Sequence, residues 1–238
     1  MNFFSNIFNL ILYQPLFNIL ILLYQYLPGH DFGIAVIILT IFIRLILYPL
    51  MTQSIKSQKV LSELQPKIQE IQQRFKNDKE KQSREMMALY QKQKINPFGG
   101  CLPLIIQLPV LIALYQVFWK GLRPEELLKL YSFVPKPEII NSTFLGILDL
   151  AKPSIILAVL AGIFQFIQTK MLTPKTSQKK DQISQFSETM QKQMLYFMPI
   201  FTIFILWRLP AAIGLYWVVT SIFSVWQQHL ILKTNKTT

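Results

Sequence analysis

The residue whose type and position most strongly suggest chemistry is Arg44, a cation inside a long apolar run. The run from Gly33 to Met51 is otherwise apolar except for Thr40, one helical turn before Arg44 on the same face. An arginine at the centre of a membrane-spanning helix costs about 2.5–3.5 kcal/mol on insertion scales, so it normally faces a partner or water. If water reaches Arg44, we expect it to attract acidic groups from another molecule. The alternative is a side chain that stretches along the helix to the membrane surface.

Polar side chains recur in the other apolar runs. Each one alone is more typical of a hydrogen bond between helices than of a site, but together they could line a polar cavity. The main ones are Gln107, Gln116, Gln165, Thr202, Thr220, Ser221 and Gln227. Two aromatic residues, Tyr216 and Trp217, lie near the end of an apolar run, where aromatic side chains often mark the membrane surface.

Residues for enzymatic or metal chemistry are sparse in the sequence. The two histidines, His30 and His229, are far apart, and a single cysteine cannot form an internal disulfide. The sequence has no Gly-rich phosphate loop, nucleophile elbow or HExxH motif. We therefore expect neither an enzyme nor a site for a metal or cofactor.

The composition places these residues in a membrane protein. The chain has 238 residues, of which 52% are hydrophobic and 15% are charged. Soluble domains are about 45–50% apolar and about 25% charged, so too few charged residues are present to cover a soluble core. The 18 Phe residues and the long Ile/Leu runs are the opposite of a disordered composition.

Runs of about 20 apolar residues predict the membrane-spanning helices. The fold class that they predict is an all-α polytopic membrane protein with five spans, the fourth of them short. Pro210 divides the last two spans, and a loop outside the membrane is expected at 121–152. The predicted spans are 31–51, 96–120, 153–172, 195–209 and 211–231.

The segment between the first two spans, 52–95, has a different character, with ten Lys/Arg and five Asp/Glu. Apolar residues recur at steps of three and four from Val60 to Phe75, which predicts an amphipathic helix that Pro66 ends early. A turn at Asn77-Asp78 and a second helix complete a helical hairpin outside the bilayer. Its second helix carries three residues on one face that either hold apolar partner segments or pack between the two helices: Met86, Met87 and Tyr90.

The distribution of basic residues predicts the orientation. Loops alternate sides, so 52–95, 173–194 and the tail 232–238 share one side, which carries 17 Lys/Arg, including Lys170 at the adjoining helix end, and 7 acidic residues. The other side carries 6 Lys/Arg and 5 acidic residues. The positive-inside rule places the hairpin and the C-terminus in the cytoplasm. The net charge of +12 is therefore mainly a topology signal, and we expect no nucleic-acid partner.

Residues 1–30 admit two interpretations. The polar residues Gln14, Asn18 and Gln25 share one helical face, which favours a helix lying in the outer membrane interface. The other interpretation is an additional span that enters from the cytoplasm. Both leave Gly33 on the outer side, so the charge distribution does not separate them.

Several long motifs occur in a familiar order. They are Thr40-Ile-Phe-Ile-Arg44 with Tyr48-Pro49-Leu50, Leu64-Gln-Pro-Lys-Ile68, Glu85-Met-Met-Ala-Leu-Tyr90, Asn96-Pro97-Phe-Gly-Gly-Cys101-Leu-Pro103, Gln107-Leu-Pro109, Met198-Pro199, Leu215-Tyr216-Trp217 and Gln227-Gln228. On these motifs the chain resembles the YidC/Oxa/Alb family of membrane protein insertases, specifically bacterial members without the large periplasmic domain. The resemblance extends from about Gln14 to His229.

The resemblance implies a fold and a function. The family has five core helices around a hydrophilic groove that is open to the cytoplasm and to lipid, and it inserts and helps fold integral membrane proteins. It implies that residues 1–30 lie in the outer interface and that the chain resides in the bacterial cytoplasmic membrane. The expected partners are the lipid bilayer, nascent membrane proteins with acidic N-terminal tails and, optionally, the Sec translocon. The groove residues expected from the matching positions are Arg44, Thr40, Gln107, Tyr216, Trp217, Thr220 and Ser221.

The chain departs from the family pattern in three places. Thr220-Ser221 stands where the family often has Ser-Asn, and Pro210-Ala-Ala212 stands where it has Pro-Ser-Gly. The tail after the last span is short, so no ribosome contact is expected. The alternative function is a small channel or transporter in which Arg44 is an anion site, but the internal repeats typical of transporters are absent from the sequence.

Overall fold

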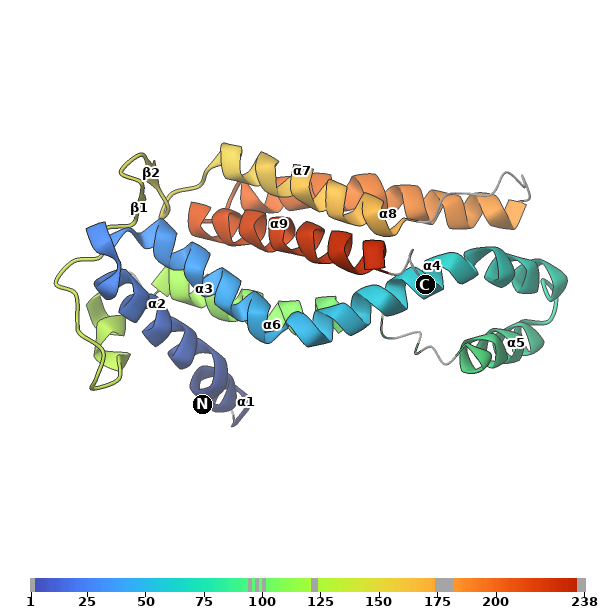
Figure 1. The fold of residues 1–238 in the computed structure, drawn as a ribbon, viewed down its shortest axis with the longest axis horizontal. Helices are drawn as coiled ribbons and strands as arrows, with labels where there is room; N and C mark the ends of the chain where they lie inside the picture. The colour runs from blue at the N-terminus through green and yellow to red at the C-terminus, as the bar shows by residue number, and fades with distance from the viewer. Residues whose placement is uncertain are drawn as a thin grey trace.

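The computed structural model describes residues 3–93, 96, 99, 102–120, 124–173 and 182–234, and most of them are helical (Figure 1). This agrees with the predicted all-α class, apart from one small hairpin of strands. The helices are α1 (Phe3–Phe8), a π-helical turn (Asn9–Tyr13), α2 (Gln14–Tyr26), α3 (Phe32–Ile46), α4 (Tyr48–Arg74), α5 (Lys79–Lys92), α6 (Leu102–Lys120), α7 (Ile155–Leu172), α8 (Gln182–Leu206) and α9 (Ala211–Thr234). Short 3₁₀ segments cover Pro28–His30 and Pro124–Lys129, and the two strands are β1 (Thr143–Phe144) and β2 (Leu148–Asp149).

Helices α7, α8 and α9 lie side by side along the length of the molecule, and α3 packs against α9 (Figure 1). The close approach of α7 to α8 depends on Gly162. A Cβ atom on this residue would lie 2.5 Å from Ile203 Cγ1 and 3.2 Å from the Pro199 carbonyl oxygen. Helices α4 and α5 extend beyond this bundle at the end opposite to the strands.

Helix α2 packs one face against α3 and α6 and buries Phe17, Leu20, Ile21 and Tyr24. Its continuous helical run, Ser5–Tyr26, is long and apolar enough to cross a membrane by length and composition. Both interpretations of residues 1–30 therefore stay open.

The predicted count of five spans stays a prediction. Among the described residues, length and composition qualify two helices, Ser5–Tyr26 and Ile155–Leu172, and a third if the bent pair α3 and α4 forms one span. Two shorter apolar helices, Ile105–Trp119 and Leu195–Leu206, coincide with the predicted second and fourth spans. The apolar part of α8 ends at Leu206, three residues earlier than expected.

Several helix ends differ from the predicted segment boundaries, which stay predictions for the membrane spans themselves. Helix α3 ends at Ile46, and after a bend of 66° the chain continues in α4, so the expected boundary at 51/52 falls inside a helix. Pro49 lies in the first turn of α4, where its missing N–H has no helical partner to lose. Arg44 is consequently in the last turn of α3 beside the bend, rather than in the middle of a straight span.

Two further corrections concern helix length. Helix α4 continues past Pro66 to Arg74, and it buries Leu64 and Ile68 on either side of the proline, so packing outweighs the lost hydrogen bond. Helix α8 begins at Gln182, inside the expected loop 173–194.

A turn at 75–78 joins α4 to α5, where Asp78 caps α5 and Gln82 Nε2 donates to the Gln72 carbonyl oxygen at 2.9 Å.

The segment 124–152 attaches to the helices through hydrogen bonds at one end of the molecule. Tyr13 Oη donates to Glu126 Oε2 at 2.5 Å, and Asn18 Oδ1 accepts from the Tyr131 backbone N–H at 2.7 Å. The carbonyl oxygens of Leu150 and Lys152 accept the first backbone N–H groups of α9. Pro210-Ala-Ala212 offers no capping side chain, so these carbonyls take its place as acceptors for the N–H groups at the start of α9.

We expect Gly162→Ala to lower the stability of the protein, because the added Cβ must displace Ile203 or separate α7 from α8. Overpacking of this kind costs about 1–3 kcal/mol. The measurement is the midpoint of heat-induced aggregation in detergent. The double variant Gly162→Ala/Ile203→Ala should recover part of the loss, and a single variant as stable as the wild type would contradict the close packing.

Candidate functional site

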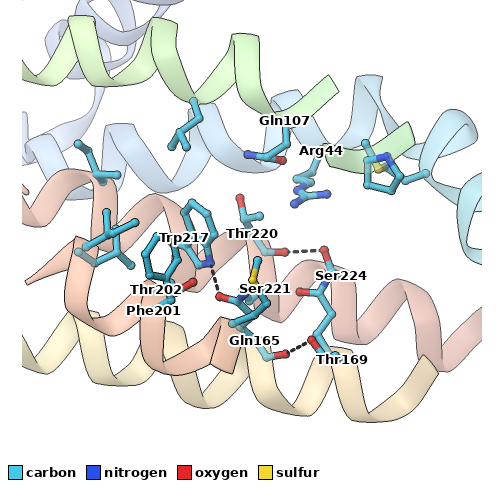
Figure 2. A pocket seen from close by; sticks show the side chains of 18 of the residues that line it. Arg44, Gln107, Gln165, Thr169, Phe201, Thr202, Trp217, Thr220, Ser221 and Ser224 are labelled. Atoms are coloured by element: carbon cyan, nitrogen blue, oxygen red, sulfur yellow. Dashed lines mark hydrogen bonds between the residues drawn. The ribbon is translucent and has the colours of Figure 1, made fainter. Parts of the chain in front are cut away.

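A cavity of about 600 Å³ lies between the helices of the bundle, and residues of α3, α4, α6, α7, α8 and α9 line it (Figure 2). Its wall has an apolar part, which comes largely from α6 and α8, with Leu111, Ile112, Met198, Phe201 and Ile205. Its polar lining residues are Arg44, Gln58, Gln107, Gln165, Gln168, Thr169, Thr202, Thr220, Ser221, Ser224, Gln227 and Gln228. Among the described residues, no Asp or Glu lines the cavity.

Of the residues that the structure describes, Arg44 is the one charged residue in this lining, and it is only 7% exposed. Within the described part of the chain, its guanidinium makes neither an ion pair nor a hydrogen bond. A guanidinium has five N–H donors, and a buried charge without partners is costly. The side chain points into the cavity in Figure 2, so its donors face a space that water or an acidic ligand could enter.

Helix α9 supplies a polar stripe along the cavity. Its residues recur at steps of three and four, which places them on one helical face. This spacing is readable in the sequence, but the predicted groove residues included only the first three, and Gln227 was named only among the polar residues that together could line a cavity. The stripe consists of Trp217, Thr220, Ser221, Ser224, Gln227 and Gln228.

Hydrogen bonds tie this stripe to the neighbouring helices. Trp217 Nε1 donates to Gln165 Oε1 of α7 at 3.2 Å. Gln227 Nε2 donates to the Tyr48 carbonyl oxygen at 3.0 Å and to Thr52 Oγ1 at 2.9 Å. Gln227 therefore bridges α9 to the first turn of α4, directly after the bend.

Two of the seven predicted groove residues do not line the cavity. Thr40 is buried, and its hydroxyl donates to the Val36 carbonyl oxygen at 2.6 Å, so its polar atom is used within α3. Tyr216 is buried behind the lining, where its hydroxyl accepts a hydrogen bond from Gln107 Nε2 of α6. The five predicted residues that the cavity brings together are Arg44, Gln107, Trp217, Thr220 and Ser221.

The predicted hairpin residues lie on α5, away from the cavity. Met87 is 47% exposed, while Met86 and Tyr90 are half-buried. The described residues contain no group of three or more His, Cys, Asp or Glu that could hold a metal ion.

Comparisons with known proteins identify relatives of this chain. The family model described as 60Kd inner membrane protein matches residues 22–238. A protein of Wigglesworthia glossinidia brevipalpis, named "Membrane protein insertase YidC", is 39% identical over 94% of this chain, which spans 37% of that relative's length. A protein of the same name from Oceanobacillus iheyensis is 39% identical, and the match covers 86% of this chain and 76% of that protein. Another from Clostridium tetani is 37% identical, and the match covers 88% of this chain and 85% of that protein.

A solved structure shares the fold. It is described as "Active YidC insertase crystal structure with the first transmembrane domain resolved". The match has a TM-score of 0.56 and 24% sequence identity, and it covers 94% of this chain and 46% of the solved chain.

The two adjacent glutamines of α9 should respond differently to loss of the amide. Gln227 and Gln228 are 1% and 2% exposed, but Gln228 Oε1 has no hydrogen-bond partner among the described residues. We expect Gln227→Leu to destabilise the protein by about 1–3 kcal/mol, because Thr52 Oγ1 loses its donor and the Tyr48 carbonyl keeps only the Thr52 hydroxyl as a side-chain donor. Gln228→Leu, as the matched control, should cost less. Thermal unfolding in detergent measures both, and equal losses would contradict the bridging role of Gln227.

Proposed function

The chain belongs to the YidC membrane protein insertase family, described as 60Kd inner membrane proteins, and we propose that it inserts and helps fold integral membrane proteins through the cavity around Arg44. The observation that carries this proposal is the buried Arg44, which faces a partly polar, partly apolar cavity without an acidic partner in its lining. Inner membrane localisation follows from the family. The substrates are nascent membrane proteins, and their acidic N-terminal tails are the groups that Arg44 attracts.

An insertase of this kind lowers the barrier for moving a polar flank of its substrate across the bilayer. Water in the cavity shortens the low-dielectric path, and the polar stripe of α9 supplies hydrogen bonds along it. Arg44 then gives an acidic tail a temporary binding position, which at 4 Å and an intermediate dielectric constant has an interaction energy of at most about 4 kcal/mol. The apolar segment of the substrate leaves into lipid, where burial of its apolar surface drives the step.

The orientation proposed for this mechanism follows the basic residues. The α4–α5 hairpin and the C-terminus lie in the cytoplasm, and the segment 124–152 lies on the outer side, in accord with the positive-inside rule. Residues 1–30 lie in the outer interface in this arrangement. A substrate tail then enters the cavity from the side of the hairpin and passes Arg44, which is beside the α3–α4 bend.

We expect Arg44→Ala to slow insertion of a single-span protein with an acidic N-terminal tail by about tenfold or more. An increase of about 1.4 kcal/mol in the insertion barrier is enough for a tenfold effect. Arg44→Lys should retain activity because it keeps the charge. The measurement is protease-protected insertion into liposomes that contain the purified protein alone.

Two controls make this experiment specific. Arg208→Ala removes one positive charge outside the cavity lining and should leave insertion unchanged. A substrate whose tail acids are replaced by Asn and Gln should lose its dependence on Arg44. Equal rates for wild type and Arg44→Ala on the acidic substrate would exclude the proposed role. Anion flux in the absence of insertion would favour the channel alternative.

The short apolar part of α8 supports a second element of the mechanism. Its apolar run Leu195–Leu206 rises about 18 Å, against about 30 Å of hydrocarbon in a bilayer. A spanning segment shorter than the hydrocarbon layer thins the bilayer around it. Thinning beside the cavity lowers the insertion barrier further.

Lengthening α8 by one apolar turn within Leu195–Leu206 should therefore reduce the insertion rate, because it restores the local bilayer thickness. The matched control inserts four polar residues after Lys136, which is exposed in the segment 124–152. The same liposome assay compares both variants. Unchanged insertion by the lengthened variant, with a folded protein in size-exclusion chromatography, would count against thinning.

A further inference from the structure

The turn of the β1–β2 hairpin exposes two large apolar side chains outside the cavity. Leu145 is 60% exposed and Ile147 is 88% exposed, with Gly146 between them. Exposed apolar residues are common singly, so exposure alone indicates little. The conformation of the turn and its attachment to the helices indicate that these two side chains are held in an exposed position.

The backbone of this turn is unfavourable for the residue that occupies it. Leu145 has φ +52° and Gly146 has φ +68°, and the Ile147 N–H donates to the Phe144 carbonyl oxygen at 3.0 Å. Two successive positive φ angles are typical of a type I′ turn, for which Asn-Gly is the preferred dipeptide. A leucine at positive φ is strained, and its exposed side chain gains little packing in return.

The turn is held firmly on the first turn of α3. One carboxylate serves both elements: Asp31 Oδ1 accepts the Ile34 N–H at 2.9 Å, and Asp31 Oδ2 accepts the Leu145 N–H at 2.5 Å. Phe144 packs so closely on Gly33 that a Cβ atom there would lie 2.6 Å from Phe144 Cβ. The two apolar side chains are therefore presented in a fixed position.

A second carboxylate holds the other strand. Asp149 accepts the Ser142 hydroxyl at 2.8 Å and lies 3.2 Å from the Lys152 ammonium. The hydrogen bond from Ser142 is the main cause that holds the pKa of the Asp149 carboxyl below its ordinary value. Both sides of the hairpin are thus fixed by charged groups, and its exposed large apolar side chains are those of the tip.

The hairpin lies at the same end of the molecule as the beginning of α7, one of the two described helices that qualify as a span (Figure 1). Helix α7 exposes a run of apolar side chains from its first turn onward: Ile155, Ile156, Val159, Leu160 and Ile163. A helix with this exposure lies against lipid, so its first turn marks where the hydrocarbon region begins. The tip is eight residues before that turn along the chain.

We propose that Leu145 and Ile147 insert into the lipid leaflet at this end of the molecule and anchor the segment 124–152 to the membrane. The partner is the bilayer, because the tip is apolar, is rigidly mounted and sits at the end of a lipid-facing helix. Asp31 couples the anchor to α3, the helix that carries Arg44. Only the identity of the leaflet, the outer one, rests on the orientation in the proposed function.

Site-specific fluorescence tests the anchor without any insertion activity. The protein, in a Cys101→Ser background, carries Ile147→Cys labelled with an NBD dye and is reconstituted in liposomes of phosphatidylcholine and phosphatidylglycerol. We expect a blue-shifted emission and at least twofold stronger quenching by phosphatidylcholine spin-labelled at acyl carbon 5 than at the control site. The control is Lys136→Cys, which is exposed in the same segment.

A second variant separates loss of the anchor from loss of the fold. Leu145→Asn produces the Asn-Gly dipeptide preferred in a type I′ turn, so the hairpin should keep its stability in detergent. Quenching of the dye at position 147 should nevertheless fall at least twofold. Quenching equal to that of the Lys136 site, or unaffected by Leu145→Asn, would overturn the proposal. A blue shift that rises with the protein-to-lipid ratio would also overturn it, because the occupant would then be a second copy of the chain.

Discussion

The structure depends on one electrostatic constraint, a buried guanidinium without a carboxylate in the lining around it. Arg44 must keep its charge, and neither lipid nor apolar side chains can satisfy five N–H donors. The polar stripe of α9 and the glutamines of α6 and α7 surround the charge with polar groups, which makes a polar interior within an apolar bundle. They line the same cavity as Arg44, but among the described residues none forms a hydrogen bond with its guanidinium, so under the proposed function a ligand with acidic groups completes the site. A neutral residue at this position would remove the reason for a polar interior.

The local folding of α3 and α4 places that charge. The bend at Leu47 ends α3 three residues after Arg44, and Gln227 fixes the new direction by binding the Tyr48 carbonyl and Thr52. Gln107 and Tyr216 hold α6 to α9 beside the cavity. The cavity is therefore kept open by hydrogen bonds between helices, while the packing of Gly162 against Ile203 closes the bundle elsewhere. Loss of either kind of contact changes the cavity without touching Arg44.

Much of this arrangement is readable in the sequence, and the exceptions have physical causes. An arginine in an apolar run and polar residues in other runs predict a polar cavity, but only Trp217, Thr220 and Ser221 of the α9 stripe were among the predicted groove residues. The sequence did not indicate which polar atoms are already used: Thr40 shares a helical face with Arg44, yet its hydroxyl binds the Val36 carbonyl. The bend at Leu47 and the passage of α4 through Pro66 depend on tertiary packing, which outweighs local helix preference. The strained Leu145 is likewise invisible in the composition, because only backbone angles reveal it.

The neighbouring helices α7 and α8 impose different demands on the bilayer. The apolar helix α7 is 18 residues long and rises about 27 Å, whereas the apolar part of α8 rises about 18 Å. Because the two helices lie side by side, the lipid cannot match both. In the proposed mechanism a bilayer of ordinary thickness matches α7, so the distortion falls on the side of α8, whose Met198, Phe201 and Ile205 form part of the apolar wall of the cavity. The proposed anchor at the hairpin tip would act against the same distortion: by holding one leaflet at the end of the molecule where α7 begins, it would confine thinning to the wall where a substrate leaves for the lipid.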